Sequence, residues 1–212
     1  MTHFADMIEG YRRFRNGGWA EQRERWEQLA EGQSPKVMVI ACSDSRSEPS
    51  QIFDTNPGEI FVVRNVAALV PPFETTPGRH GVSAALEFAV QFLKIEEIVV
   101  MGHGMCGGCH AALHRTMEGA EPGRGGFIAD WIAVLDEAAE TVRAEYAEID
   151  NREAGRAMEM AAVRVSIDNL RTFPCILVKE RRGTLKLRGA FFAIADGVLH
   201  LMDDATGDFS PA

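Results

Sequence analysis

Residues 36–46 read KVMVIACSDSR, a short apolar run that passes directly into a polar segment. Two further short runs, residues 60–64 (IFVVR) and 97–101 (EIVVM), are also rich in β-branched side chains. Continuous apolar runs of this length are typical of parallel strands that are buried on both faces of a sheet. We therefore predict that the three runs are strands of one parallel sheet.

Helical patterns separate these strands. Apolar residues recur at helical spacing between positions 82 and 93, and again between positions 160 and 170. Chains that alternate strands and helices in this way form α/β folds. The predicted fold class is therefore α/β, a single domain with a mainly parallel central β-sheet flanked by helices.

The last part of the chain predicts three more strands. Residues 174–178 (PCILV) predict a fourth strand, because they form a short apolar run. Residues 185–194 and 198–202 predict two more, and the Asp196-Gly197 dipeptide between them is a common hairpin turn.

Residues 1–32 predict an N-terminal helical arm, with aromatic and apolar residues placed among many charges. Residues 33–212 form the α/β domain in this interpretation. A short amphipathic arm of this kind packs either on a homodimer partner or on its own domain, and the sequence leaves both alternatives open.

The charge balance excludes some partners. The 212 residues include 22 basic and 31 acidic ones, which gives a formal net charge of −9. A nucleic-acid partner needs a basic face, and an anionic membrane attracts basic segments, so we predict neither partner.

The four cysteines and the N-terminal segment indicate a reducing compartment. No apolar run is long enough to span a bilayer, and residues 1–11 lack the apolar core of a signal peptide. We therefore predict a cytoplasmic protein. Cysteines in such a compartment are metal ligands or buried apolar residues more often than disulfides.

Two polar segments follow neighbouring predicted strands. Residues 42–46 (CSDSR) follow the first strand, and residues 102–108 (GHGMCGG) follow the third. Sites in α/β folds form at the carboxyl ends of the strands, so we expect the two segments to meet at one edge of the sheet.

Three side chains in these segments predict a zinc site. Zinc favours thiolate and imidazole ligands, and catalytic zinc keeps three protein ligands and one open position. His103 and Cys106 lie within one turn and can chelate an ion, and Cys42 can supply the third bond. Each fragment alone is weak, since a free cysteine after a strand is usually a core residue. Their placement at two strand ends strengthens the hypothesis.

Asp44 and Arg46 add a possible catalytic pair. A neighbouring Arg keeps a carboxylate ionised and orients it. An ionised Asp accepts a hydrogen bond only from a group that has a proton, such as a zinc-bound hydroxide. The alternative for this pair is a surface salt bridge of little energetic value.

Together, these motifs closely resemble those of the β-class carbonic anhydrases. The resemblance extends through residues 57–67, 83–90 and 188–190 and covers most of the chain, from about residue 33 to 203. It implies an α/β fold with a mainly parallel sheet and a homodimer or dimer of dimers. It also implies one zinc ion per chain, bound by Cys42, His103 and Cys106.

The resemblance also implies an activity, the reversible hydration of carbon dioxide to bicarbonate and a proton. The nucleophile is a zinc-bound hydroxide, and Asp44 and Arg46 are the catalytic dyad that orients it. The implied substrate-binding residues, some reaching the site from the partner subunit, are Gln33, Phe61, Val66, Phe88 and Gly107.

Some positions depart from the family pattern or indicate a branch. Gly104 stands where the family usually has Ser, and Phe88 stands where the plant-like branch has Tyr. Val39 stands where the bicarbonate-inhibited branch has Trp, so the resemblance favours the plant-like branch.

Three rival functions stay open. A related electrophile, such as carbon disulfide or carbonyl sulfide, needs the same zinc site. A zinc-stabilised binding protein without turnover is disfavoured, because a structural site needs a fourth protein ligand. A thiol redox protein is ranked last. Among possible proton carriers, His80, His110 and His114 carry little weight individually.

Overall fold

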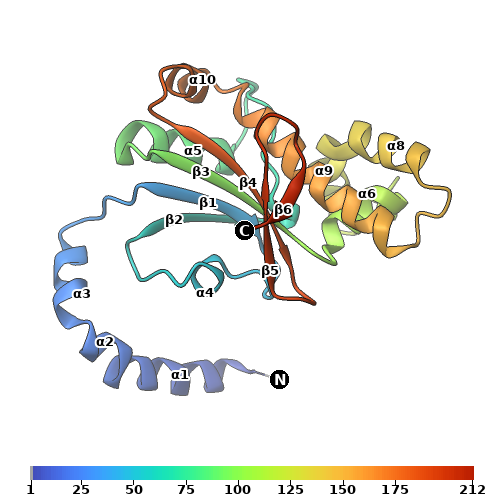
Figure 1. The fold of residues 1–212 in the computed structure, drawn as a ribbon. Coiled ribbons are helices and arrows are strands. Elements are labelled where there is room, and N and C mark those ends of the chain that lie inside the picture. Colours follow the sequence, from blue (N-terminus) through green and yellow to red (C-terminus); the bar gives the residue numbers. More distant parts are fainter. Residues whose placement is uncertain (1) are drawn as a thin grey trace. The chain divides into compact units, whose positions relative to one another are not determined.

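The protein, described here for residues 2–212 by a computed structural model, is built on one six-stranded β-sheet (Figure 1). The strand order is β2-β1-β3-β4-β5-β6, and the first four strands in that order are parallel, whereas the last two pair antiparallel. The strands are β1 (Val37–Cys42), β2 (Ile60–Asn65), β3 (Glu97–His103), β4 (Lys186–Ala193), β5 (Val198–Met202) and β6 (Phe209–Pro211). The predicted fold class is confirmed.

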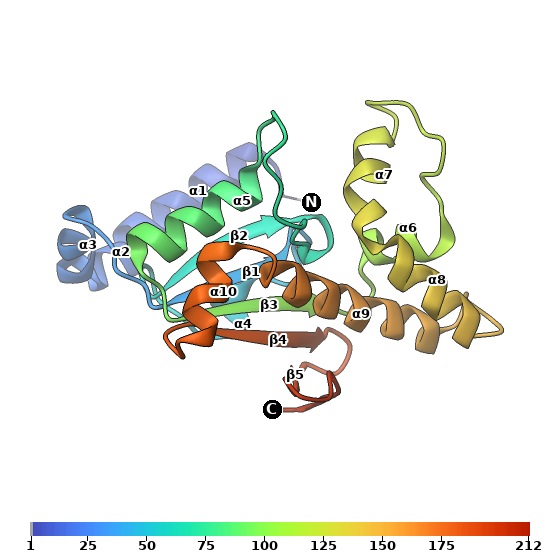
Figure 2. The same cartoon turned by 90° about the horizontal axis from the view of Figure 1, so that it is seen from above.

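Helices cover both faces of the sheet, and others lie beyond the carboxyl ends of its strands. Figure 2 shows α5 (Gly81–Glu87), α9 (Arg152–Leu170) and α10 (Pro174–Arg181) lying across one face of the sheet. α4 (Pro49–Ile52) lies on the other face, as Figure 1 shows. Beyond the carboxyl ends of the strands lie α6 (Gly107–His114), α7 (Gly126–Ile132) and α8 (Asp136–Glu145).

Short irregular turns join some of these elements. A π-helical turn, Phe88–Leu93, continues α5, so the helical segment predicted over positions 82–93 is confirmed. Two 3-10 turns are Val66–Ala68, directly after β2, and Ala133–Leu135, before α8. The helix predicted over 160–170 is also confirmed, and it begins earlier, at Arg152.

The prediction of a strand at residues 174–178 is wrong, because these residues begin α10. Pro174 occupies the first turn of that helix, where its missing N–H removes no hydrogen bond. Ile176 is buried in the same core cluster as Val90 and Leu185. A five-residue apolar run fits one face of a short helix as well as it fits a strand, and β4 already fills the position beside β3.

The hairpin predicted at Asp196-Gly197 is confirmed. β4 and β5 pair antiparallel, from Ala193 opposite Val198 to Ala190 opposite Leu201. Gly197 in the turn between them has φ 67°, a left-handed conformation that glycine adopts without strain.

The register of the central strands places the site. Ala41 of β1 lies opposite Met101 of β3, and His103 lies opposite Phe192 of β4. Parallel neighbours therefore end together, and the segments that follow β1 and β3 leave the sheet at the same edge.

The chain divides into two compact units, one that ends at Ser34 and one from Pro35 to Ala212. The first contains α1 (Phe4–Asn16), α2 (Gly18–Glu21) and α3 (Arg23–Ala30), so the N-terminal segment is helical as predicted. Its status as a separate domain and the surface on which it packs stay predictions. Within residues 2–212, none of the helices is long and apolar enough to cross a membrane.

Candidate metal centre

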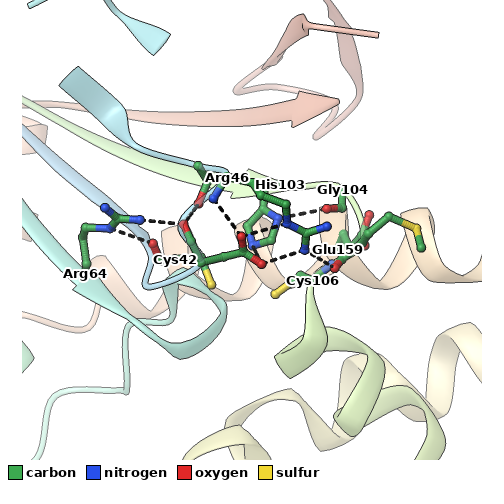
Figure 3. A network of polar contacts seen from close by, with 10 residues as sticks. Cys42, Arg46, Arg64, His103, Gly104, Cys106 and Glu159 are labelled. Carbon is green, nitrogen blue, oxygen red and sulfur yellow. Dashed lines mark hydrogen bonds and ion pairs between the residues drawn. The ribbon is translucent and has the colours of Figure 1, made fainter. Parts of the chain in front are cut away.

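Two buried thiols and one buried imidazole meet at the carboxyl edge of the sheet (Figure 3). Cys42 is the last residue of β1, His103 is the last residue of β3, and Cys106 is the N-cap of α6. One ligand atom from each lies within 4.8 Å of the other two. The structure thus brings together the three side chains that the sequence predicts as metal ligands.

The ring of His103 is held in the tautomer that a metal needs. Its Nδ1 lies 2.9 Å from the carbonyl oxygen of Gly104, and because a carbonyl only accepts, Nδ1 carries the proton. The Nε2 atom then carries a free lone pair. It is buried and has no hydrogen-bond partner among residues 2–212. A buried acceptor without a partner fits a metal ligand.

Contacts between the thiols favour thiolate at Cys106. Hydrogen bonds from Cys109 and Cys42 lower the pKa of Cys106, and the same contact with Cys106 raises the pKa of Cys42. The position of Cys106 at the N-terminus of α6 also favours its thiolate. A set of two sulfur atoms and one nitrogen atom fits zinc with one open coordination position.

Asp44 and Arg46 form a bidentate pair beside these ligands. Arg46 Nε lies 2.9 Å from Asp44 Oδ1, and its Nη2 lies 2.7 Å from Oδ2. The hydrogen bond from the Arg46 side chain holds the pKa of Asp44 well below its usual range. Arg46 Nη2 also donates to the carbonyl of Met105, at 3.1 Å. The pair therefore connects the segment after β1 with the turn after β3, which an isolated surface ion pair does not do.

Arg64 of β2 supports the same segment through its guanidinium. Its Nε donates to the carbonyl of Cys42 at 2.9 Å, and its Nη2 donates to the carbonyl of Asp44 at 2.6 Å. Its Nη1 also pairs with the carboxylate of Glu48. The guanidinium is thus engaged at each of its three nitrogen atoms.

Glu159 of α9 is a site residue that the sequence did not indicate. It is 7 % exposed, and its Oε1 accepts a hydrogen bond of 2.9 Å from the backbone N–H of Cys106. Burial raises its pKa to about 7. A single Glu in an amphipathic helix, far along the chain from the ligands, has no pattern that distinguishes it from a surface residue.

The predicted pocket residues lie on separate elements. The rings of Phe61 (β2) and Phe88 pack with their centroids 5.9 Å apart, and Phe88 is partly exposed. Val66 adjoins the start of α6, since a Cβ added at Gly108 would lie 2.8 Å from its Cγ1. Gln33 is exposed and belongs to the first unit, so its role toward substrate stays a prediction.

A cavity of about 900 Å³ reaches the metal-ligand turn from another direction. Cys106 and Glu159 line it together with His110 and His114, whose ring centroids lie 4.1 Å apart at an interplanar angle of 36°. Neither Asp44 nor Arg46 is among the described residues that line it. The cavity therefore approaches Cys106 without including the dyad.

Cys106 and Cys109 have the C-x-x-C spacing of thiol redox proteins, so ranking that class last for want of such a spacing is wrong. Burial argues against a redox role, because both thiols are 3 % exposed. Reactive cysteines are at least partly accessible, whereas buried ones are inert.

Comparison with known proteins gives one family. A family model for carbonic anhydrase matches residues 37–199. The chain is 36 % identical over 193 residues to Beta carbonic anhydrase 5, chloroplastic, of Arabidopsis thaliana. The matched region is 91 % of this chain and 62 % of that protein, so the chain spans less than two thirds of the length of this relative.

Solved structures give the same result. The structure of the β-carbonic anhydrase CcaA matches with a TM-score of 0.90 and 30 % identity, over 99 % of this chain and 92 % of that one. Two tetrameric β-carbonic anhydrases from the ascomycete Sordaria macrospora provide a match with a TM-score of 0.78 and 28 % identity, over 98 % of both chains. The similarity covers the sheet and both polar segments at its carboxyl edge.

Proposed function

Since the chain belongs to the family of β-class carbonic anhydrases, we propose that it catalyses the reversible hydration of carbon dioxide to bicarbonate and a proton. The observation that carries this proposal is the meeting of Cys42, His103 and Cys106 beside an arginine-paired carboxylate. We propose these three residues as the ligands of one zinc ion per chain. A zinc ion held there would supply Lewis-acid chemistry and lower the pKa of a water molecule toward neutrality.

Asp44 orients the reacting water in this proposal. Its carboxylate is ionised, so it accepts a hydrogen bond and donates none. A water or hydroxide that donates a hydrogen bond to Asp44 must turn a lone pair elsewhere, toward the carbon of the substrate. Arg46 fixes the carboxylate by its bidentate contact, and the carbonyl of Met105 fixes Arg46 in turn.

Apolar side chains provide the place for carbon dioxide. Phe61, Val66 and Phe88 are proposed to line this pocket, which suits a small molecule without a dipole. The backbone N–H of Gly107 and the side-chain amide of Gln33 are proposed as donors to the oxygen atoms of bicarbonate. Gly107 is exposed and has open space around its Cα, so a ligand can approach its backbone closely.

We assign the chain to the plant-like branch. Two features support this. Val39 is buried within β1, where the other branch has Trp. The chain resembles that other branch at Arg64, but here the guanidinium is engaged by Cys42, Asp44 and Glu48. A homodimer or a dimer of dimers is proposed as the assembly, and the tetrameric Sordaria proteins support it. A cytoplasmic location stays a prediction.

The test is a stopped-flow assay of carbon dioxide hydration on protein of measured zinc content. We expect rapid hydration by the wild-type chain and none above background after His103→Ala, which removes a ligand. Zinc-loaded protein that leaves the uncatalysed rate unchanged would instead favour the zinc-stabilised binding protein. Parallel assays with carbon disulfide and carbonyl sulfide separate the related electrophiles.

A further inference from the structure

We infer that Glu159 is a positioning residue for the metal-ligand turn, where it holds the backbone of Met105 and Cys106 so that the Cys106 sulfur faces Cys42 and His103. The inference rests on the zinc site of the proposed function. It adds a residue to which none of the sequence patterns pointed.

The turn between His103 and Cys106 is strained. Met105 has φ 58°, a left-handed conformation that is unfavourable for a residue with a side chain. Residues held in such a conformation persist when the surrounding structure fixes them. Successive backbone N–H groups beside a left-handed residue point to one side and form a concavity that suits an anion or a carboxyl group.

Glu159 fills this concavity. Its Oε1 accepts from the Cys106 N–H at 2.9 Å (Figure 3), and the backbone of Met105 also acts on the same carboxyl group and lowers its pKa. Both partners belong to the turn that carries a metal ligand. The contact is between helix α9 and this turn, so the helix that packs on the sheet also fixes the ligand loop.

The burial of Glu159 makes a role at this turn the best account of the residue. It is the one carboxylate among the buried polar residues of the described chain. None of the ion pairs within residues 2–212 involves it. A carboxyl group buried without a cationic partner is costly, and hydrogen bonds to backbone donors offset that cost.

Hydrogen bonding to the backbone of the metal-ligand turn needs an acceptor oxygen on residue 159 and does not depend on the charge of the carboxyl group. Replacing Glu159 by Gln keeps an acceptor oxygen on a side chain of equal length. Replacing it by Met keeps the length and volume and removes the acceptor, which leaves the Cys106 N–H buried without a partner. Glu153, which lies on the same helix but is exposed, provides the matched control Glu153→Gln.

The experiment measures zinc affinity by competition with a chromophoric chelator, on the full chain, for the wild type and the three variants. Substitution of outer residues that orient metal ligands typically weakens binding about 10- to 100-fold. We expect this loss for Glu159→Met, and we expect Glu159→Gln and Glu153→Gln to stay within about threefold of the wild type. Cobalt-substituted Glu159→Met should also show a shifted thiolate-to-cobalt charge-transfer band, because the Cys106 sulfur is displaced.

Several outcomes overturn the inference. One is a Glu159→Met chain that binds zinc as tightly as the wild type with an unchanged cobalt spectrum. Another is a Glu159→Gln chain that binds zinc as weakly as Glu159→Met, because the charge of Glu159 and not its acceptor oxygen would then account for the loss. A third is a Glu159→Met chain that does not fold even in excess zinc, because Glu159 would then stabilise the whole fold and not this turn in particular. A wild-type chain that binds zinc but does not hydrate carbon dioxide refutes the proposed function and leaves this test valid.

Discussion

Oδ2 of Asp44, which follows β1, lies 4.0 Å from Nε2 of His103, the last residue of β3. The same oxygen accepts from Arg46 at 2.7 Å. An ionised carboxylate thus stands next to the one imidazole nitrogen of the centre that has no hydrogen-bond partner within residues 2–212. This geometry supports a role for Asp44 toward a group bound to the metal and gives the first prediction.

Asp44→Asn should keep zinc and lose most of its turnover. The amide is nearly the same size as the carboxylate, but it can present a donor where the reacting water needs an acceptor. Loss of a positioning group of this kind lowers kcat by about 10²-fold. The measurement is stopped-flow hydration with zinc content determined on the same sample. Asp130→Asn, an exposed position on α7, is the control, and an Asp44→Asn rate within about twofold of the control would refute this role.

Cys106 and Cys109 should behave differently toward zinc although both are buried and their thiols are in contact. The ligand atoms that lie within 4.8 Å of one another come from Cys42, His103 and Cys106. Cys106→Ala should therefore lose most of its zinc, and Cys109→Ala should keep one ion per chain. Metal analysis after desalting checks both variants. Equal losses of zinc would make Cys109 a fourth ligand and favour a closed, structural site.

Gly108→Ala should destabilise the fold near the site, whereas Gly107→Ala should not. A Cβ at Gly108 would lie 2.8 Å from Val66 Cγ1 and 3.0 Å from Ala67 Cβ, but a Cβ at Gly107 would meet nothing within 4 Å. Overpacking of this kind costs about 1–3 kcal/mol of unfolding free energy. Urea unfolding compares the two variants with the wild type. If Gly108→Ala were as stable as Gly107→Ala, the close contact with the turn after β2 would be excluded.

Bicarbonate should not lock the enzyme in an inactive state. The bicarbonate-inhibited branch resembles this chain at Arg64, but here its guanidinium already donates to the carbonyls of Cys42 and Asp44 and pairs with Glu48, so an anion would have to break these contacts. Val39 provides no aromatic wall for such a site. The catalytic rate is measured against bicarbonate concentration at constant pH and ionic strength. Steep, cooperative inhibition would place the chain in the other branch.

The sequence predicts the sheet and the metal ligands well because both depend on local patterns. β1, β2 and β3 are short runs rich in β-branched residues, as strands of a parallel sheet are, and the ends of parallel neighbours converge whatever the loops do; β2, at the edge of the sheet, is only half-buried. Cys42 follows the first run directly, and His103 follows the third after one residue, Gly102. Their meeting therefore follows from topology.

Features that depend on long-range packing could not be predicted. An apolar run of five residues does not distinguish a strand from one face of a helix, and residues 174–178 became α10 because β4 takes the place beside β3. Glu159 reaches Cys106 only because α9 packs over the strand ends. The left-handed Met105 has no sequence mark at all, since it is neither Gly nor Asn.

The central claim is that zinc bound by Cys42, His103 and Cys106 makes this chain a carbon dioxide hydratase, and a zinc add-back titration tests it most directly. The protein is stripped with a chelator under reducing conditions, and hydration is followed by stopped flow while zinc is returned in steps. We predict that the rate is lost on stripping, rises linearly with zinc and stops rising at one ion per chain. A rate that survives stripping, or that stays at the uncatalysed level when one zinc ion is bound, would contradict the claim.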